Sequence, residues 1–204
     1  MTLALIDYGA GNLRSVENAL RAAGARDIAV TADPEAVAAA ERIVLPGVGA
    51  FAACMGALSG IPGMVEALDR RVRGDGRPFL GICVGMQLMA DAGEEFGRTA
   101  ALGWIPGTVA KLECDDPAIR VPHMGWNDVT PAIPHPLIVP GEAYFLHSFA
   151  FRPAEGSDLA ATTDHGGQVT AAVARDNLIG VQFHPEKSQA YGLAFLSRFL
   201  TWRP

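Results

Sequence analysis

The chain has 204 residues, with 16 Lys and Arg against 22 Asp and Glu, which gives a formal net charge of −6. Half of the residues are apolar and 19% are charged, so the chain can bury a core, which argues against intrinsic disorder. The acidic balance argues against nucleic acid or an anionic membrane as the main partner. Three cysteines are too few for a disulfide scaffold and indicate a reducing, cytoplasmic compartment. We therefore expect a single domain over residues 1–204.

One uncharged stretch, residues 43–65, is long enough at 23 residues to cross a bilayer. It contains five glycines and two prolines, which favour a strand, a turn and a helix of small residues inside a core. The N-terminal residues include no basic side chain before Asp7, so no targeting segment is expected.

Strand and helix signals alternate in the first half of the chain. We expect strands at residues 3–7, 28–31, 42–45 and 79–82, the third closed by Pro46-Gly47. We expect helices at 12–23 with Asn12 as the cap, from Asp33-Pro34 onward, at 63–73 and at 84–90. The second half has closely spaced strands at 108–112, 126–130, 144–149, 169–174 and 178–183, then a helix at about 191–202.

This pattern predicts an α/β fold whose mainly parallel sheet is flanked by helices, with additional antiparallel strands in the second half. In such sheets the working site lies at the carboxyl ends of the strands.

Cys83 lies in Gly81-Ile82-Cys83-Val84-Gly85, between an expected strand and an expected helix. This is the form of a nucleophile elbow with Cys in place of Ser: the glycines leave room for a tight turn, and the helix N-terminus favours the thiolate. A buried structural cysteine beside packing glycines would give the same pattern. His184-Pro185-Glu186 follows the last apolar strand, and residues two apart on an extended segment face the same side. Because a thiol nucleophile needs a base and the base needs an orienting acceptor, the combination favours a Cys83–His184–Glu186 triad.

A glycine-rich loop at residues 45–51, Leu-Pro-Gly-Val-Gly-Ala-Phe, also follows a strand. Its glycines let backbone N–H groups approach a ligand closely, and beside an elbow they would form an oxyanion hole together with the N–H of Val84. An ordinary strand-to-helix turn would look the same in this segment alone.

Metal ligation has little support in the sequence. Cys54 and Cys114 have no partner at ligand spacing and are expected to be core thiols, and Trp126 is expected to be a packing residue. The remaining histidines are well spread along the chain: His123, His135, His147 and His165. No metal and no other cofactor is expected.

The segment from Gly81 to Gln87, together with His184-Pro185-Glu186, resembles the class I (triad) glutamine amidotransferases. Within that class, further segments resemble the family of glutaminase subunits of imidazole glycerol phosphate synthases: residues 7–12 (DYGAGN), 46–51 (PGVGAF), 123–127 (HMGWN), 144–148 (YFLHS) and 184–188 (HPEKS). By this resemblance Cys83 would be the nucleophile, His184 the base and acid, and Glu186 the residue that orients it.

The resemblance also implies roles outside the triad. The oxyanion hole would be formed by Val48, Gly49 and Val84. The amino-acid end of glutamine would be held by Gln87, Glu95 and the backbone around His147, Ser148 and Phe149. The positions at a subunit interface would be Asn12, Tyr144 and Lys187.

Ammonia released into water would be protonated and lost as a nucleophile. Because only 18 residues follow Glu186, we expect the acceptor site on another chain. The resemblance implies a heterodimer with a cyclase subunit built as a (βα)₈ barrel, which would make imidazole glycerol phosphate and an aminoimidazole-carboxamide ribonucleotide in histidine biosynthesis.

Three alternatives remain open at this point. The chain could be the glutaminase subunit of another synthase, such as that of vitamin B6 synthesis. It could be a free-standing γ-glutamyl hydrolase or cysteine peptidase, fully active without a partner. It could also be a non-catalytic scaffold, although the intact Cys83, His184 and Glu186 argue against that.

Overall fold

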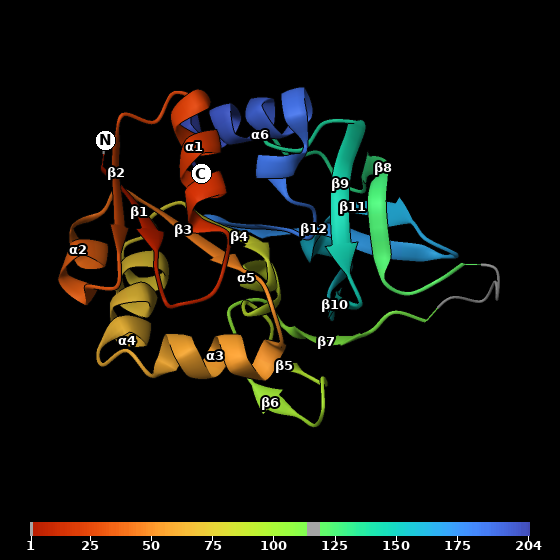
Figure 1. The fold of residues 1–204 in the computed structure, drawn as a ribbon, viewed down its shortest axis with the longest axis horizontal. Helices are drawn as coiled ribbons and strands as arrows, with labels where there is room; N and C mark the ends of the chain where they lie inside the picture. The colour runs from red at the N-terminus through yellow and green to blue at the C-terminus, as the bar shows by residue number, and fades with distance from the viewer. Residues whose placement is uncertain (1, 114–118) are drawn as a thin grey trace.

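The computed structural model of the chain describes residues 2–113 and 119–204. Within these residues nine strands form one sheet with helices on both faces, and four strands form a second, smaller sheet (Figure 1). The large sheet contains β1 (Thr2–Ile6), β2 (Asp27–Thr31), β3 (Arg42–Gly47), β4 (Phe79–Cys83), β8 (His123–Pro131), β9 (Gly141–His147), β11 (Leu159–Asp164), β12 (Gln168–Arg175) and β13 (Leu178–Val181). The small sheet contains β5 (Ala92–Gly93), β6 (Thr99–Ala100), β7 (Gly107–Lys111) and β10 (Phe149–Pro153).

The large sheet has the strand order β2-β1-β3-β4-β13-β12-β11-β8-β9. The strands from β2 to β13 in this order pair in parallel, and those from β13 to β9 pair antiparallel. The predicted fold class is therefore confirmed. Because β3, β4 and β13 are neighbours and run in the same direction, their carboxyl ends meet at one edge of the sheet.

Helices cover the large sheet on both sides, with α1 and α6 above it and α3, α4 and α5 below it in Figure 1. Their bounds are α1 (Leu13–Ala22), α2 (Pro34–Ala39), α3 (Phe51–Ser59), α4 (Met64–Asp69), α5 (Val84–Gln87) and α6 (Gln189–Thr201). Shorter turns are a π-helical segment η1 (Arg70–Gly74) and the 3₁₀ turns η2 (Gly156–Asp158) and η3 (Pro185–Lys187). The predicted cap of α2 is confirmed, since the Asp33 side chain accepts the Glu35 N–H at 3.0 Å and Pro34 opens the helix.

Several boundaries differ from the prediction. β3 continues through Pro46 and Gly47. Proline has no N–H to donate, but this does not interrupt the sheet, because β1 pairs with β3 only as far as Val44. Asn12 stands at the N-cap position of α1, but its side chain makes no capping hydrogen bond. The helix after Cys83 ends at Gln87 rather than at residue 90, because the N–H groups of Met89 and Ala90 bond to carbonyls three residues back instead of four. The predicted helix at 63–73 is α4 followed by the π-helical η1.

The predicted strand at residues 144–149 is two strands in different sheets. β9 ends at His147, the chain bends at Ser148, and β10 begins at Phe149 and pairs with β7. β11 was not predicted, and neither were the two-residue strands β5 and β6. Trp126 is 47% exposed, so its prediction as a packing residue is wrong. Cys54 is buried as expected, whereas Cys114 lies outside the described residues.

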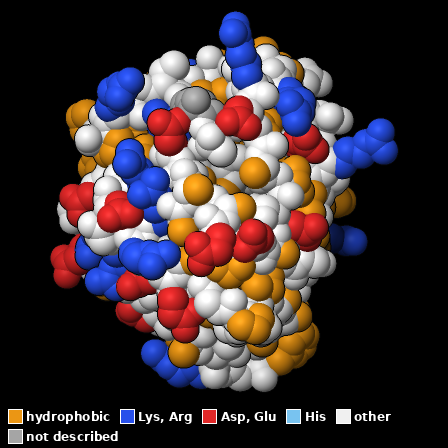
Figure 2. Space-filling view, turned by 90° about the vertical axis from the view of Figure 1, so that its left-hand side faces the viewer, with side chains coloured by type: hydrophobic (Ala, Val, Ile, Leu, Met, Phe, Trp, Pro, Cys, Tyr) orange, Lys and Arg blue, Asp and Glu red, His pale blue; other side chains and the backbone are white. Residues whose placement is uncertain are grey.

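The uncharged stretch forms β3, a loop and α3, as predicted, and α3 buries Phe51, Cys54 and Leu58. Among the described residues, no single helix has the length and apolarity to cross a membrane; α3 with α4 and η1 passes that test only as a pair, bent by 92°. On the face of the molecule near β2 and α2, acidic and basic side chains are interspersed over the surface (Figure 2).

Candidate active site

Cys83 sits on a strained turn at the point where β4 passes into α5. Its backbone has φ 54° and ψ −113°, a conformation that non-glycine residues rarely adopt. The flanking glycines are sterically required: a Cβ on Gly81 would lie 2.6 Å from the Gly85 carbonyl oxygen, and a Cβ on Gly85 would overlap the Leu45 carbonyl. The geometry is that of the predicted nucleophile elbow.

His184 and Glu186 reach the same place from the neighbouring strand. β13 pairs with β4 so that Val181 lies beside Ile82, and the chain then continues past Cys83 into η3. His184 Nδ1 donates to Glu186 Oε1 at 2.8 Å, and these side chains are only 3% and 2% exposed. Burial by itself lowers the pKa of His184, but its hydrogen bonds and charge interactions with Cys83 and Glu186 prevail and raise it to about 9. At neutral pH the imidazole is therefore held as an imidazolium beside the sulfur.

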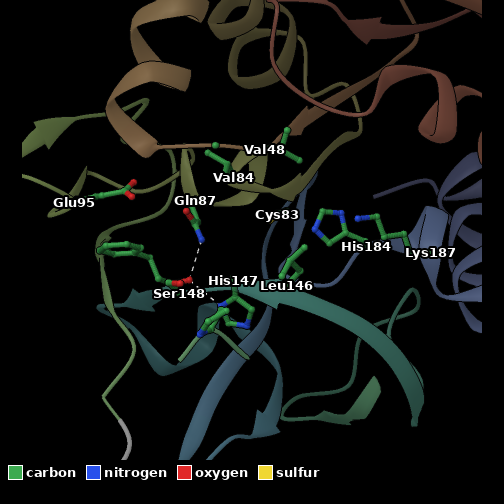
Figure 3. A pocket seen from close by; sticks show the side chains of 13 residues that line it. Val48, Cys83, Val84, Gln87, Glu95, Leu146, His147, Ser148, His184 and Lys187 are labelled. Carbon is green, nitrogen blue, oxygen red and sulfur yellow. Dashed lines mark hydrogen bonds between the residues drawn. The ribbon is translucent and has the colours of Figure 1, made fainter. Parts of the chain in front are cut away.

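A cavity of about 350 Å³ opens beside these residues (Figure 3). It is lined by Val48, Gly49, Cys83, Val84, Gln87, Glu95, Pro122, Leu146, His147, Ser148, Phe149, His184 and Lys187. All of the residues predicted for the oxyanion hole and for glutamine binding are in this set. In Figure 3, Glu95 and Ser148 lie toward one end, and His184 and Lys187 toward the other. The cavity thus has the Glu95 carboxylate and the Cys83 thiol at separate places along its length.

Gln87 and Glu95 are both held by hydrogen bonds within the protein. Gln87 Nε2 donates to the Phe149 carbonyl and to Gln182 Oε1, each at 3.0 Å, which leaves its side-chain oxygen for a ligand. Glu95 accepts the N–H of Phe51, the first residue of α3, at 2.7 Å. Its neighbour Glu94 does not line the cavity and instead pairs on the surface with Arg98.

Core side chains hold the carbonyl groups of the glycine-rich loop. Tyr8 Oη donates to the Pro46 carbonyl at 2.7 Å, and Cys54 Sγ donates to the Val48 carbonyl at 3.4 Å. Gly49 has φ +108°, which needs glycine. Two carbonyls of the loop are therefore turned toward core partners.

Gln182 is a site residue that the sequence interpretation missed. It is fully buried, and its Nε2 donates to Cys83 Sγ at 3.6 Å while its Oε1 accepts from Gln87. It connects the nucleophile to the far wall of the cavity. A signal was present, because a glutamine interrupts the apolar run that leads to His184.

The residues predicted for an interface lie around the mouth of the cavity or near it. Lys187 is exposed, lines the cavity and has its Nζ 5.8 Å from the centre of the Tyr144 ring. Asn12 is exposed at the start of α1, which packs against η3 and therefore near Lys187. Two large apolar side chains of β8 are also exposed here, Met124 at 66% and Trp126 at 47%.

The histidines are less separated in space than in the sequence. His123, His147 and His165 form one cluster, with ring centroids 4.2 and 5.0 Å from that of His123. Within the described part of the chain, no group of three or more His, Cys, Asp or Glu side chains is disposed to hold a metal ion.

Comparisons with known proteins agree with this geometry. The family model described as glutamine amidotransferase class-I matches residues 4–201. The imidazole glycerol phosphate synthase subunit HisH of Zymomonas mobilis is 65% identical over 206 residues, covering 100% of this chain and 97% of that protein. The HisH subunit of Caulobacter vibrioides is 56% identical, covering 100% and 99%. A crystal structure of a glutamine amidotransferase superposes with a TM-score of 0.75 at 17% identity, covering 98% of this chain and 99% of the other. The chain therefore belongs to the class I glutamine amidotransferases and, within them, to the family of HisH subunits of imidazole glycerol phosphate synthase.

Proposed function

We propose that this chain hydrolyses glutamine to glutamate and ammonia with Cys83, His184 and Glu186, and that it delivers the ammonia to a cyclase subunit. The cyclase would use it to make imidazole glycerol phosphate and an aminoimidazole-carboxamide ribonucleotide in histidine biosynthesis. The observation that carries the proposal is the single cavity that holds a strained nucleophilic cysteine, an oriented histidine and a separate carboxylate. A reduced Cys83 is required, which fits the cytoplasm as the compartment.

The chemistry follows from the protonation states. With the pKa of His184 raised to about 9, the resting imidazole carries the proton that it can later give to the leaving nitrogen. The Cys83 sulfur attacks the side-chain carbonyl carbon of glutamine, and the oxyanion accepts hydrogen bonds from backbone N–H groups of Val84 and of the Val48–Gly49 loop. His184 protonates the departing nitrogen, which leaves as ammonia. Water then gives a proton to His184 and hydrolyses the glutamyl thioester, so glutamate leaves and the sulfur is restored.

The shape of the cavity suits glutamine in one orientation. Glu95 offers a carboxylate to the α-ammonium group, and Gln87 offers the oxygen that its internal hydrogen bonds leave over. The backbone of His147, Ser148 and Phe149 would bind the α-carboxylate. The side-chain amide then extends away from Glu95 toward Cys83, which lies between Gln87 and His184 (Figure 3).

A partner subunit over the cavity mouth would explain the surface there. Met124, Trp126 and Leu146 are exposed beside the mouth, and an apolar rim next to a catalytic cavity is typical of an interaction surface. Tyr144 and Lys187 border the same rim, and Asn12 lies near it. A (βα)₈-barrel cyclase seated there would receive ammonia before water protonated it.

The test measures glutaminase activity of the chain alone, and then with a cyclase barrel and its nucleotide ligand. We expect near-silence alone, strong activation in the mixture, and loss of activity in Cys83→Ala. Met124→Glu should abolish the activation, whereas Val30→Glu, at an exposed apolar residue of β2, should leave it unchanged. High activity of the chain alone, unaffected by the barrel, would instead identify a free-standing hydrolase. Glutaminase activity that survived Cys83→Ala would refute the triad.

A further inference from the structure

The histidine cluster lies on the inner face of β8 and β9. His123 pairs directly with His147 across the two strands. The His123 ring lies between two others, with His165 stacked at 4.2 Å and Phe145 stacked at 4.7 Å. Because the described residues hold no arrangement fit for a metal ion, the cluster needs another explanation.

At one end of the cluster, two backbone groups fix the orientation of Asn127. Its Oδ1 accepts the N–H of Asp128 at 2.8 Å, and its Nδ2 donates to the Asp164 carbonyl at 2.6 Å. The amide therefore cannot be turned over without losing both hydrogen bonds. The second hydrogen of Nδ2 points to His123 Nε2 at 3.1 Å, so that ring nitrogen must be the acceptor.

At the other end, a carbonyl fixes the tautomer of His147. Its Nδ1 lies 2.9 Å from the Phe149 carbonyl oxygen, which can only accept, so Nδ1 carries a proton. Its Nε2 lies 3.0 Å from His123 Nδ1. Since His123 Nε2 accepts, His123 Nδ1 holds the proton and donates it to His147 Nε2. Each hydrogen bond in the series thus points the same way, from Asn127 to Phe149.

Neither ring has room for a further proton. A proton on His123 Nε2 would face the N–H of Asn127, and one on His147 Nε2 would face the N–H of His123. The surroundings act in the same direction: burial, with the nearby histidines, lowers the pKa of His123 to about 3 and that of His147 to about 4. The titratable rings that face the pair are His165 and His184, and the Asp164 carboxylate instead accepts a backbone N–H from Gly167.

We propose that Asn127, His123 and His147 form a one-directional relay of neutral hydrogen bonds that positions the Phe149 carbonyl, and with it the glutamine-binding wall of the cavity. The same carbonyl accepts the second hydrogen bond, from Gln87, so the relay and Gln87 hold it from two sides. His123 and Asn127 are positioning residues, since they do not line the cavity and act through His147, which does. The consequence for glutamine rests on the proposed function, whereas the tautomers do not.

Without the relay, His147 Nε2 loses its hydrogen-bond donor, so the ring is free to turn away from the Phe149 carbonyl or to take a proton. The first change removes a donor from the Phe149 carbonyl, and the second puts a positive charge into the cavity wall. The cost to glutamine binding would therefore be larger at pH 6 than at pH 8.

The spectroscopic test records long-range ¹H–¹⁵N correlations of the imidazole rings of the full chain from pH 8 to pH 5. We expect His123 and His147 to remain neutral Nδ1–H tautomers throughout, with His135→Asn used to assign a ring outside the cluster. In Asn127→Asp the donor to His123 becomes an acceptor, so the His123 pKa should rise into the measured range. Asn18→Asp, on the exposed face of α1, is the matched control. An Nε2–H tautomer on either ring, or ordinary titration near pH 6.5 in the wild type, would overturn the proposal.

The binding test compares the glutamine KM of the activated complex for His123→Leu and His123→Asn. Leucine removes both hydrogen bonds, while the amide nitrogen of asparagine sits where Nδ1 was and keeps the donor to His147. In His123→Leu we expect KM to rise about fivefold over wild type at pH 8. At pH 6 the rise over wild type should be about three times larger still, and kcat should change less than KM at both pH values. In His123→Asn, KM should return to within about twofold of wild type. Equal KM values in wild type and His123→Leu at both pH values would refute the positioning role. A complex without any glutaminase activity would refute the proposed function, and the tautomers would still decide the relay.

Discussion

Replacing Glu186 with Gln tests the electrostatics of the proposed triad at nearly constant volume. The carboxylate is 2% exposed and accepts from His184 Nδ1 at 2.8 Å. A hydrogen bond to a charged group is worth ~1.5–3 kcal/mol and a neutral one ~0.5–1.5 kcal/mol, so the imidazolium should lose ~1–2 kcal/mol of stabilisation. That is about one pKa unit, which brings the pKa of His184 down from about 9. We expect kcat to fall about five- to thirtyfold. KM should change little, because Glu186 does not line the cavity.

The same variant should also change how the free energy of unfolding depends on pH, in a direction that follows from the raised pKa of His184. Because the folded-state pKa of His184 is raised above 6.5, its stabilising contribution is fully present below about pH 6.5 and is lost as pH rises through about 9. Glu186→Gln should therefore be destabilised by ~1–2 kcal/mol at pH 6. At pH 9.5 the difference should vanish or reverse, since Glu186 Oε2 is buried without a hydrogen-bond partner among the described residues.

Chemical unfolding at the two pH values, with kcat from the cyclase-activated complex, measures both effects. Glu94→Gln is the matched control, because it makes the same substitution at a carboxylate that is half exposed and pairs with Arg98 at 3.7 Å. It should change stability by less than ~0.5 kcal/mol at either pH. Equal destabilisation of Glu186→Gln at pH 6 and pH 9.5, or an unchanged kcat, would refute the reasoning.

Three further substitutions test the packing and polar contacts around the site. Gln182→Leu removes the contact to Cys83 and should lower kcat of the complex by about five- to thirtyfold, equivalent to ~1–2 kcal/mol, while the fold remains intact by circular dichroism; unchanged kcat would contradict this. Gly85→Ala puts a methyl group where the Leu45 carbonyl lies, so the glycine-rich loop must move away from residue 85, and stability should fall by ~1–3 kcal/mol in denaturant titrations. Gly56→Ala, in open space on α3, should be neutral or stabilising. Asp158→Asn weakens the bidentate pair with Arg175, at 2.9 and 2.6 Å with the carboxylate buried, and should cost ~1–3 kcal/mol in the same titrations; a loss no larger than that of a surface substitution would count against it.

The predictable parts of this molecule are those in which one short segment determines the geometry. The elbow could be predicted because glycines stand two residues before and two residues after Cys83. At both of these positions, Gly81 and Gly85, a Cβ would clash with the backbone. The meeting of His184 and Glu186 with Cys83 could be predicted because the two residues stand directly after a strand, and that strand, β13, lies beside β4. Segment likeness pointed to the residues of the cavity wall, and the structure places Glu95, not Glu94, in that wall.

Features that depend on pairing between distant segments could not be predicted in this way. Tyr144 to Phe149 has the pattern of one strand, yet the chain changes sheets at Ser148, because Phe149 pairs with Lys111 of β7 while Tyr144 pairs with Trp126 of β8. No local propensity marks that bend.

The histidine relay depends on such pairing most directly. His123 lies at the start of β8 and His147 at the end of β9. Their contact depends on the register in which these two strands pair, because that register sets His123 opposite His147. A shift of β9 by one residue against β8 would exchange the buried and exposed faces of β9, placing Leu146 inside and His147 in water. The exposed apolar rim and the buried polar relay thus lie on opposite faces of the same pair of strands, β8 and β9. A change that disturbs the β8–β9 pairing should therefore impair partner binding and the glutamine-binding wall together.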